Sequence, residues 1–317
     1  MAQHWTLDAM PDQQGRLVVI TGANSGIGFE AAKALAGKGA RVILAVRNAA
    51  KGQVALEKIR AVHPQAQVEL DLLDLADLSS VRAFAERFQT RYSALPVLIN
   101  NAGVMATPYR RTADGFELQF GTNHLGHFAL TGLLLPAILA APGARVVTVS
   151  SMAHSFGQIN FDNLDGSKGY QRWMAYGQSK LANLLFAYEL QRRFAASGAR
   201  AISLACHPGY ADTELQKVGP RMDGFALGEA LSGLLNRVFA QSAAMGALPT
   251  LYAATSPDAH GGDFIGPDGP GGARGYPVPQ RSNARSYDPA LARRLWEVSE
   301  QLTGVRYAFP AEVYAAD

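Results

Sequence analysis

Tyr176 and Lys180 stand four residues apart in a stretch that we expect to be helical. Residues at that spacing share one face of a helix, so the lysine ammonium can lie beside the tyrosine phenol. A phenol ordinarily titrates near ~10, but one positive charge ~4 Å away, at an effective dielectric of ~20, is worth about 4 kcal/mol. Such a charge would lower the pKa of the phenol to near ~7, where it can exchange a proton with a substrate oxygen. The same spacing is common on solvated helix faces, so the rest of the chain must decide between the two interpretations.

A glycine-rich turn near the start of the chain has the properties of a phosphate-binding loop. Glycines at positions 22, 26 and 28 follow the apolar run 17–20 and open a segment with helical periodicity. Glycine lets the backbone approach a pyrophosphate, and the following helix offers free amides and the positive end of its dipole. A tight connection between a strand and a helix would explain these glycines too, but their position after the first strand favours a dinucleotide site. The chain contains no GxxxxGK[ST] motif, which argues against a P-loop.

The end of the second expected strand bears on the choice of nucleotide. Enzymes that use NAD usually carry an acidic residue about ~20 residues after the glycine turn, where it holds the ribose hydroxyls. Here Arg47 occupies that position, Lys51 follows it, and no acid is near. An arginine suits the 2′-phosphate of NADP, although a surface arginine needs no ligand at all. The combination favours NADP(H).

The elements that must position these residues alternate regularly along the chain. Short apolar runs alternate with segments of helical periodicity, which is typical of a parallel sheet covered by helices on both faces. The fold class is therefore α/β, a doubly wound parallel sheet of about seven strands. The expected strands are 17–20, 41–46, 68–73, 97–99, 145–149 and 201–205, and the expected helices are 29–37, 49–63, 79–92, much of 113–139, and 176–196.

Two segments fall outside this alternation. Residues 209–241 form a long insertion with helical character, which we interpret as a substrate lid within a single domain of residues 1–317. A satellite core or a subunit contact would explain its apolar residues as well. Residues 261–280 contain seven glycines and four prolines, and the apolar residues among them indicate an ordered, turn-rich segment.

Composition limits the class of protein and its partners. Of the 317 residues, 48% are hydrophobic and 17% are charged, which is typical of a globular protein. A formal net charge of +3, without a dense basic run, gives no indication of nucleic acid. The single cysteine, Cys206, excludes an intrachain disulfide. The first 16 residues lack the apolar core of a signal peptide and the stretch 129–141 is too short to span a bilayer, so we expect a soluble, cytoplasmic protein.

Taken together, these residues resemble the short-chain dehydrogenase/reductase family, whose fold is of the Rossmann type. Seven motifs in the family's order make the resemblance specific, and it runs from about residue 18 to residue 213. In chain order the motif residues are Gly22, Asn24, Ser25, Gly26, Ile27 and Gly28; Asp74 and Leu75; Asn101, Ala102 and Gly103; Asn123; Ser151; Tyr176 and Lys180; and Pro208, Gly209 and Thr213.

The resemblance implies a role for each motif. Tyr176 would exchange the proton with the substrate oxygen, and Ser151 would hydrogen-bond that oxygen and stabilise its developing charge. Lys180 would lower the pKa of the tyrosine and hold the nicotinamide ribose, and Asn123 would position a water that relays protons. Hydride would pass directly between the nicotinamide and the substrate carbon. The glycine turn would bind the pyrophosphate, Asp74 and Leu75 the adenine, and the turn of Pro208, Gly209 and Thr213 the carboxamide.

One departure from the compact members of the family indicates a subgroup. Ser151 and Tyr176 are separated by 24 residues, about twice the usual gap, and the apolar residues in this insertion could wall a hydrophobic pocket. They are Phe156, Ile159, Phe161, Leu164, Tyr170 and Trp173. With Arg47, this insertion is similar to the retinol-dehydrogenase-like branch, to which the protochlorophyllide reductases are neighbours. That branch prefers NADP and acts on bulky apolar alcohols and aldehydes.

We therefore predict an NADP(H)-dependent oxidoreductase that interconverts an apolar aldehyde or ketone with its alcohol. The alternatives are a reductase of a carbon–carbon double bond, as in enones or protochlorophyllide, and a catalytically silent NADP-binding sensor. By analogy, a homo-oligomer would associate through the helices within 113–139 and 176–196. His124 and His127 share a helical spacing, but no third ligand accompanies them, so we expect packing roles and no metal. His154 could line the pocket or simply belong to a turn.

Overall fold

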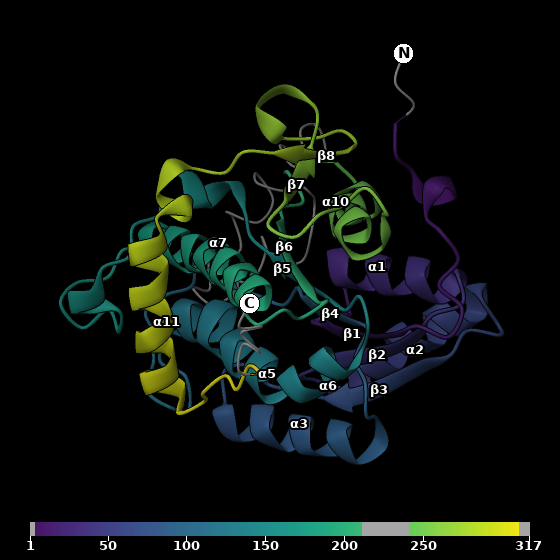
Figure 1. Ribbon diagram of the computed structural model, residues 1–317, viewed down its shortest axis with the longest axis horizontal. Coiled ribbons are helices and arrows are strands. Elements are labelled where there is room, and N and C mark those ends of the chain that lie inside the picture. The colour runs from purple at the N-terminus through teal and green to yellow at the C-terminus, as the bar shows by residue number, and fades with distance from the viewer. Residues whose placement is uncertain (1–3, 211–240, 311–317) are drawn as a thin grey trace, which may run out of the picture.

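The computed structural model describes residues 4–210 and 241–310 of the chain. Within these ranges eight strands form one sheet in the order β3-β2-β1-β4-β5-β6-β7-β8 (Figure 1). The neighbouring pairs from β3 to β7 are parallel, and β8 pairs antiparallel with β7. The strands are β1 (Leu17–Thr21), β2 (Arg41–Val46), β3 (Val68–Leu72), β4 (Val97–Asn100), β5 (Arg145–Val149), β6 (Ile202–Cys206), β7 (Phe264–Pro267) and β8 (Pro277–Gln280). The predicted doubly wound α/β class is confirmed, with one strand more than the number expected.

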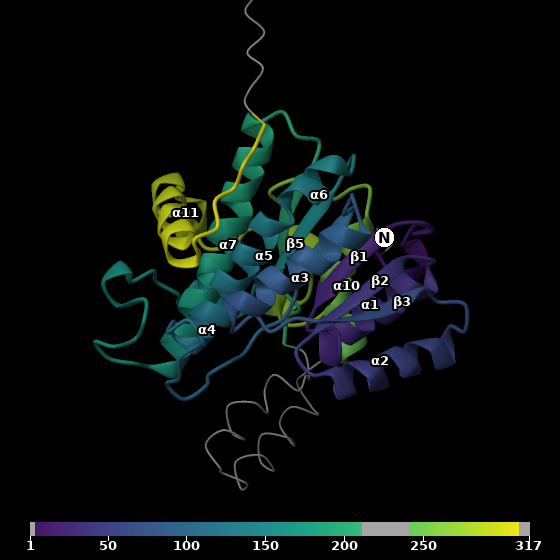
Figure 2. The ribbon, with the colours of Figure 1, turned by 90° about the horizontal axis from the view of Figure 1, so that it is seen from below.

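Helices cover both faces of the sheet (Figures 1 and 2). One face packs against α1 (Gly26–Gly37), α2 (Ala49–Val62) and α10 (Ala243–Thr255). The other face packs against α3 (Leu78–Arg91), α5 (Gly126–Leu133), α6 (Leu135–Ala140) and α7 (Arg172–Ala196). Outside this second layer, α11 (Pro289–Thr303) lies along α7 and contacts α5. The central strands are therefore buried on both faces, which is why they consist of continuous apolar runs.

The order of the strands determines where a ligand can enter. From β1 the chain moves outward through β2 and β3 and then returns to the other side of β1 as β4. In an open α/β sheet, ligands bind at the carboxyl ends of the strands where the strand order reverses in this way. That point is the crevice between the ends of β1 and β4. Among the described residues, each predicted motif follows the carboxyl end of a strand or lies on a helix of the adjoining layer.

The helix that we expected over much of 113–139 is interrupted. It begins at α4 (Leu118–Phe120), because the Glu117 carboxylate accepts hydrogen bonds from the amides of Gln119 and Phe120. A π-helical turn, η2 (Gly121–Leu125), follows and leads into α5 and α6. Such turns are frequent at functional sites, and this one contains Asn123.

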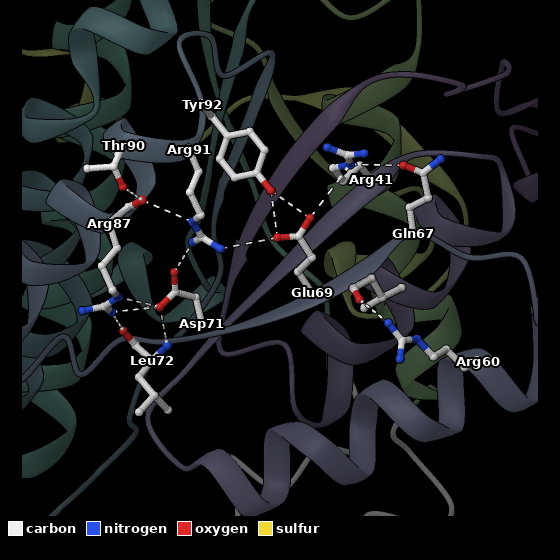
Figure 3. Close-up of polar contacts among 11 residues, drawn as sticks. Arg41, Arg60, Gln67, Glu69, Asp71, Leu72, Arg87, Thr90, Arg91 and Tyr92 are labelled. Carbon is white, nitrogen blue, oxygen red and sulfur yellow. Dashed lines mark hydrogen bonds and ion pairs between the residues drawn. The ribbon is translucent and has the colours of Figure 1, made fainter.

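Polar contacts attach α3 to β3 at the outer edge of the sheet (Figure 3). Asp71 on β3 accepts hydrogen bonds from Arg87, at 3.0 Å from its Nε, and from Arg91. Glu69 accepts from the hydroxyl of Tyr92 at 2.7 and 2.8 Å. Charged side chains on an edge strand oppose pairing with another chain. These contacts also fix the position of β3, whose carboxyl end leads to Asp74 and Leu75.

Of the two segments that fall outside the predicted alternation, the structure describes one in full and only the ends of the other. The turn-rich segment 261–280 is ordered, as predicted, and supplies β7, a 3-10 turn and β8. Most of the insertion 209–241, with the proposed lid, lies outside the described residues. Within the described ranges, no helix is long and apolar enough to cross a membrane.

Candidate active site

The glycine turn follows β1 and leads directly into α1. Gly22 and Gly26 have positive φ angles of 67° and 56°, which side chains disfavour. A Cβ on Gly28 would lie 2.4 Å from Nδ2 of Asn101 and 2.7 Å from the carbonyl oxygen of Gly22. The glycines are therefore required by the backbone itself, and the turn is packed against the segment that follows β4.

Thr21 attaches the glycine turn to the motif after β4. Its hydroxyl oxygen accepts hydrogen bonds from the amides of Asn101 and Ala102, both at 2.9 Å. The side chain of Asn101 donates back to the carbonyl of Thr21 at 2.8 Å. Two of the motifs predicted from sequence, 80 residues apart, are thus joined at the crevice between β1 and β4.

The N-terminus of α1 fits an anionic ligand. The cap residue Ser25 makes no side-chain hydrogen bond to the helix, and the first turn contains no acidic residue. The first amides of a helix lack partners within it, so here they are available to phosphate oxygens. Arg47 is exposed directly after β2, and Lys51 is exposed in the first turn of α2. This glycine cradle, amides and cation fit the phosphates of a dinucleotide.

Asp74 and Leu75 follow the carboxyl end of β3. The Asp74 carboxylate accepts a hydrogen bond from the amide of Ala76, and its own amide donates to Ser80. Leu75 is buried, and a Cβ on Gly126 would lie 2.5 Å from its carbonyl oxygen. The pair is thus fixed at the carboxyl edge of the sheet, two strands from the glycine turn.

Ser151 and Tyr176 meet beyond the carboxyl end of β5. Ser151 begins the 3-10 turn η3 (Met152–Ser155), and Tyr176 lies in the second turn of α7. The Ser151 side chain lies close enough to the Tyr176 phenol to favour its ionised form. Lys180 lies one turn further along α7, where its Nζ donates to the carbonyl of Val149 at 3.2 Å and stands 5.7 Å from the centre of the Tyr176 ring.

The pKa of Tyr176 differs from the value near 7 that we expected. Burial raises the pKa of the phenol to about 12, and the hydrogen bond from Ser151 offsets only part of this effect. Burial likewise lowers the pKa of Lys180 to about 8. The expectation treated the lysine as a charge beside a solvated phenol. Both groups are in fact buried, so the loss of hydration outweighs their attraction.

Asn123 clamps the chain after β4. Its Oδ1 accepts from the amide of Val104 at 2.8 Å, and its Nδ2 donates to the carbonyl of Val104 and to the hydroxyl of Ser179, both at 2.9 Å. It approaches Lys180 across Gly103, where an added Cβ would lie 3.1 Å from Oδ1 of Asn123 and 3.6 Å from the lysine Nζ. The structure thus gathers Asn123, Ser151, Tyr176 and Lys180 at one site. The water relay through Asn123 remains a prediction.

The turn after β6 approaches the same edge. Gly209 has a positive φ of 67°, and a Cβ there would lie 2.3 Å from the carbonyl oxygen of Ala273. The carbonyl of Pro208 accepts a hydrogen bond from Gln241 at 2.6 Å. Thr213, the third residue of this predicted motif, lies outside the described residues.

The insertion between Ser151 and Tyr176 divides into two parts, so the prediction that it walls one pocket is only partly met. Phe156 and Trp173 are exposed beside Tyr176. The Trp173 ring lies edge-on to the Tyr176 ring at 6.4 Å between centres, and a Cβ on Gly177 would lie 2.7 Å from the ring of Phe156.

The remaining apolar residues of the insertion pack elsewhere. Ile159, Phe161 and Leu164 join a separate cluster with residues of α4, α7 and α11. The hydroxyl of Tyr170 donates to the carbonyl of Thr107 at 2.8 Å. These four side chains therefore stabilise the insertion and its attachment to the domain, which residue type alone does not reveal.

His154 has a role that the sequence did not indicate. Its Nδ1 lies 2.6 Å from the carbonyl oxygen of Ser151, and its Nε2 accepts from the amide of Asn283 at 3.3 Å. The side chain of Asn283 donates in turn to the carbonyl of His154. The histidine therefore braces the turn that carries Ser151. Its partner is 129 residues away, so no local pattern could have revealed it.

His124 and His127 do not form a metal site. In the part of the chain that the structure describes, no group of three or more potential ligands could hold a metal ion. His124 is buried and bonds Ser299 of α11 at 2.9 Å, while His127 bonds Thr21 at 2.8 Å and the carbonyl of Asn123 at 2.9 Å. The two rings thus contact different parts of the protein.

Comparison with known proteins agrees with this geometry. The model of the short chain dehydrogenase family matches residues 16–223. Retinol dehydrogenase 12 of Mus musculus is 43% identical over 298 residues, which cover 92% of this chain and 88% of that protein. Polyprenol dehydrogenase of Homo sapiens is 38% identical over 300 residues, covering 93% of this chain and 87% of that protein.

A solved structure is also similar over nearly the whole chain. The crystal structure of an uncharacterized protein from Mycobacterium paratuberculosis superposes with a TM-score of 0.79 at 46% identity. The match covers 98% of this chain and 100% of the other. The similarity therefore extends through the insertion after Ser151 and the C-terminal helix.

Proposed function

The chain belongs to the short-chain dehydrogenase/reductase family of oxidoreductases, and we propose that it transfers hydride between NADPH and an apolar aldehyde or ketone. In the reverse direction the substrate is the corresponding alcohol. Family membership supplies the reaction class and the use of a nicotinamide cofactor. The preference for NADP rests on Arg47. The apolar substrate rests on four exposed apolar side chains near buried Tyr176, which we call the apolar rim: Met152, Phe156, Trp173 and Met174.

The cofactor would lie across the crevice between β1 and β4. The glycine turn with Asn24, Ser25 and Ile27 and the amides of α1 suit its pyrophosphate, and Asp74 with Leu75 suits the adenine. Arg47 stands where an enzyme specific for NAD would carry an acid, so it can pair with a 2′-phosphate. Asn101, Ala102 and Gly103, with the turn of Pro208, Gly209 and Thr213, would border the nicotinamide. These assignments support NADP(H) as the cofactor.

The chemistry that the nicotinamide supplies when bound is hydride transfer to or from carbon. Tyr176 gives its proton to the carbonyl oxygen as charge develops there. Because burial raises the pKa of the phenol to about 12, the tyrosine is fully protonated at neutral pH and ready to act as the acid. Ser151 donates a hydrogen bond to the same oxygen. A preorganised donor of this kind stabilises the developing charge without reorganisation.

Lys180 stabilises the tyrosine after it has lost its proton. With a pKa of about 8, the lysine is mostly charged at pH 7. Its ammonium is fixed near the Tyr176 ring by the carbonyl of Val149. In a buried site that charge favours the phenolate, so the lysine makes proton transfer less costly. Asn123 holds the chain after β4 against α7 and would order the water that returns a proton.

The exposed apolar side chains of the segments that carry Ser151 and Tyr176 support an apolar substrate. Met152 directly follows Ser151, Phe156 covers Gly177, and Trp173 and Met174 precede Tyr176 on α7. Their exposed fractions are between 39% and 46%. Grouped apolar exposure of this kind marks a binding surface. The named relatives act on retinol and on polyprenol, both long apolar alcohols, so we propose a substrate of that class.

Oxidation of NADPH against a panel of aldehydes, ketones and enones tests the proposal. We expect turnover of long apolar aldehydes, including retinal and a polyprenal, and less turnover of short ones. The Tyr176→Phe variant should lose nearly all turnover and bind NADPH as tightly as the unmodified protein. Turnover of enones without carbonyl reduction would favour the double-bond reductase, and NADPH binding without any turnover would favour the silent sensor.

Three further parts of the proposal concern the whole chain. Residues 1–317 would form one domain, with 209–241 serving as a substrate lid. The protein would act in the cytoplasm. Self-association through the helices within 113–139 and 176–196 would have to accommodate α11, which lies along α7 (Figure 2). Sedimentation of the protein with and without NADPH measures its oligomeric state.

A further inference from the structure

His127 is fully buried and bonds two segments of the proposed site. Its Nε2 lies 2.8 Å from the hydroxyl oxygen of Thr21, the last residue of β1. Its Nδ1 lies 2.9 Å from the main-chain carbonyl oxygen of Asn123. The ring therefore connects the start of the nucleotide turn to the helical turn that carries Asn123, although the two are about a hundred residues apart in sequence.

The contact with Asn123 determines which ring nitrogen carries the proton. A carbonyl oxygen can only accept a hydrogen bond. The nitrogen beside it, Nδ1 of His127, must therefore carry the hydrogen and donate it to the carbonyl of Asn123.

The contact with Thr21 leads independently to the same tautomer. A hydroxyl oxygen has two lone pairs and one hydrogen. Both lone pairs of Thr21 are taken by the amides of Asn101 and Ala102, so the hydroxyl can only donate. Its nearest acceptor is Nε2 of His127 at 2.8 Å, since the carbonyl oxygen of Ile99 lies 3.4 Å away. Nε2 therefore carries no proton.

A proton on both ring nitrogens would break this arrangement. A hydrogen on Nε2 would point at the oxygen of Thr21, whose lone pairs already bind the chain after β4. Burial, together with the charge of Lys180, lowers the pKa of His127 to about 4. The neutral ring is thus compatible with every neighbour that it contacts, and the charged ring is not.

The contact falls where the helix is irregular. Asn123 lies in the π-helical turn η2, in which the amide of Gly126 bonds the carbonyl of Gly121, five residues back. A widened turn has fewer constraints from its own ladder of hydrogen bonds than an α-helical turn. The hydrogen bond from His127 fixes the main chain of this turn at Asn123. The Asn123 side chain in turn bonds Val104 and Ser179.

We propose that His127 is a positioning residue, whose neutral ring with the proton on Nδ1 ties the main chain of Asn123 to Thr21. It fixes the position of the turn that carries Asn123 relative to the nucleotide turn, so that Asn123, Lys180 and the bound cofactor keep their relative positions. The kinetic consequence rests on the proposed function, whereas the tautomer does not.

Nuclear magnetic resonance of protein labelled with ¹⁵N-histidine tests the tautomer without any substrate. The long-range proton–nitrogen pattern of each ring distinguishes a proton on Nδ1 from one on Nε2, and loss of one signal in the His127→Asn variant assigns it. We expect the Nδ1–H form, with no titration between pH ~5.5 and ~8, where an ordinary histidine titrates. An Nε2–H pattern, or titration near pH ~6.5, would overturn the proposal.

Three substitutions separate positioning from packing. His127→Asn keeps a donor near Nδ1, His127→Gln keeps an acceptor near Nε2, and His127→Phe keeps only the ring. We expect the Phe variant to lose about 10- to 100-fold in kcat with little change in KM or in NADPH affinity, because misplacement near a reacting centre costs that much. Asn should restore most of the loss and Gln should not.

His124→Phe is the matched control, because it replaces a buried imidazole that lies one turn before His127 and bonds Ser299, not Thr21. It should lower stability and leave kcat within about twofold. Unchanged kcat in the Phe variant, or equal losses with Asn and Gln, would show that His127 only packs. If the unmodified protein reduces no carbonyl, the proposed function fails, and the tautomer still decides whether the link exists.

Discussion

At the scale of single residues, Tyr176 is governed more by burial than by its charged neighbour. A phenolate in a buried site loses the hydration that stabilises it in water, and Lys180 loses hydration as well. The result is a protonated acid beside an ammonium with a pKa of about 8. A tyrosine in that state suits reduction of a carbonyl, in which it must give up a proton, better than oxidation, in which it must first lose one.

This arrangement predicts the pH dependence of reduction. Because the pKa of Lys180 is lowered, its charge is present below about 8 and is lost as the pH rises through that value. Tyr176 keeps its proton to about 12, so it does not limit the reaction in that range. We expect kcat/KM for reduction to be level near neutrality and to fall above pH ~8 by up to about tenfold per unit.

Initial rates between pH ~6 and ~10 at limiting aldehyde measure this profile, because kcat/KM reports the free enzyme. Lys180→Arg keeps its charge over the whole range, so its lower rate should show no such fall. A level profile in the unmodified protein would mean that the lysine charge does not assist the proton transfer.

Arg47 carries the prediction of cofactor preference. It is exposed directly after β2. No acidic residue that could hold the ribose hydroxyls of NAD lies between it and Lys51. Arg47→Asp should repel a 2′-phosphate and accept hydrogen bonds from the ribose of NADH, shifting the ratio of the two kcat/KM values toward NADH by about 100-fold or more. Lys58→Asp, at an exposed position on α2, is the control for the change of charge. A ratio that hardly moves would exclude Arg47 as the phosphate contact.

At the scale of elements, local patterns predicted β1 to β6 well, missed β7 and β8 in the turn-rich segment, and placed the ends of the helices less well. β2 and β5 have the predicted bounds, because buried parallel strands are continuous apolar runs between polar turns. In contrast, α7 begins four residues earlier than expected, because the side chain of Gln171 accepts a hydrogen bond from the amide of Met174 and caps the helix there. α1 begins at Gly26, since its first residues belong both to the glycine turn and to the helix.

The first turn of α7 and the turn after β5 together make the apolar rim. Both are attached closely, since a Cβ on Gly157 would lie 2.2 Å from the carbonyl oxygen of Gly177. Trp173 and Phe156 are thereby held near Tyr176 while their side chains stay exposed. Rigid elements with exposed apolar side chains can bind a long apolar substrate without the cost of ordering a loop.

Trp173→Ala should therefore weaken binding of long substrates selectively. Removal of the indole loses apolar contact worth about 1–3 kcal/mol, or about 5- to 150-fold in kcat/KM for a long-chain aldehyde. A short aldehyde that does not reach the rim should be reduced at nearly the original rate. Val62→Ala, at an exposed apolar position on α2, is the control. An equal loss for long and short aldehydes would mean that Trp173 supports Tyr176 and does not select the substrate.

At the scale of the whole molecule, the site is assembled from contacts between distant parts of the chain. Thr21 meets Asn101 and His127, and His154 meets Asn283. The motifs themselves were predictable because each has a local signature of residue types at a fixed spacing. The histidine contacts were not, because their partners are set by the packing of helices on the sheet. A buried histidine has the same local pattern whether it braces a catalytic turn or only fills the core.

Buried histidines make the stability of the whole fold sensitive to acid. Burial lowers the pKa of His124 to about 3 and those of His127 and His207 to about 4. Each stays neutral in the folded protein at a pH where the unfolded chain, with a histidine pKa near ~6.5, binds a proton. The part of the free energy of unfolding that depends on these neutral rings is therefore fully present above pH ~6.5. It is lost as the pH falls toward the pKa values of the rings in the folded protein.

We expect the free energy of unfolding to fall steeply below pH ~6.5, by about 3 kcal/mol for each such histidine by pH ~4. Urea denaturation at pH ~7.5, ~6 and ~5 measures this loss in a range above most carboxylate titrations. His124→Phe should be less stable at neutral pH, because the bond to Ser299 is gone, yet should lose less on acidification. His260→Gln, at a side chain that is 80% exposed, should not change the slope. An equal free energy of unfolding at pH ~7.5 and ~5 would mean that the folded protein takes up protons on these histidines as readily as the unfolded chain does. The neutral form of His127 would then not be needed to hold the site together.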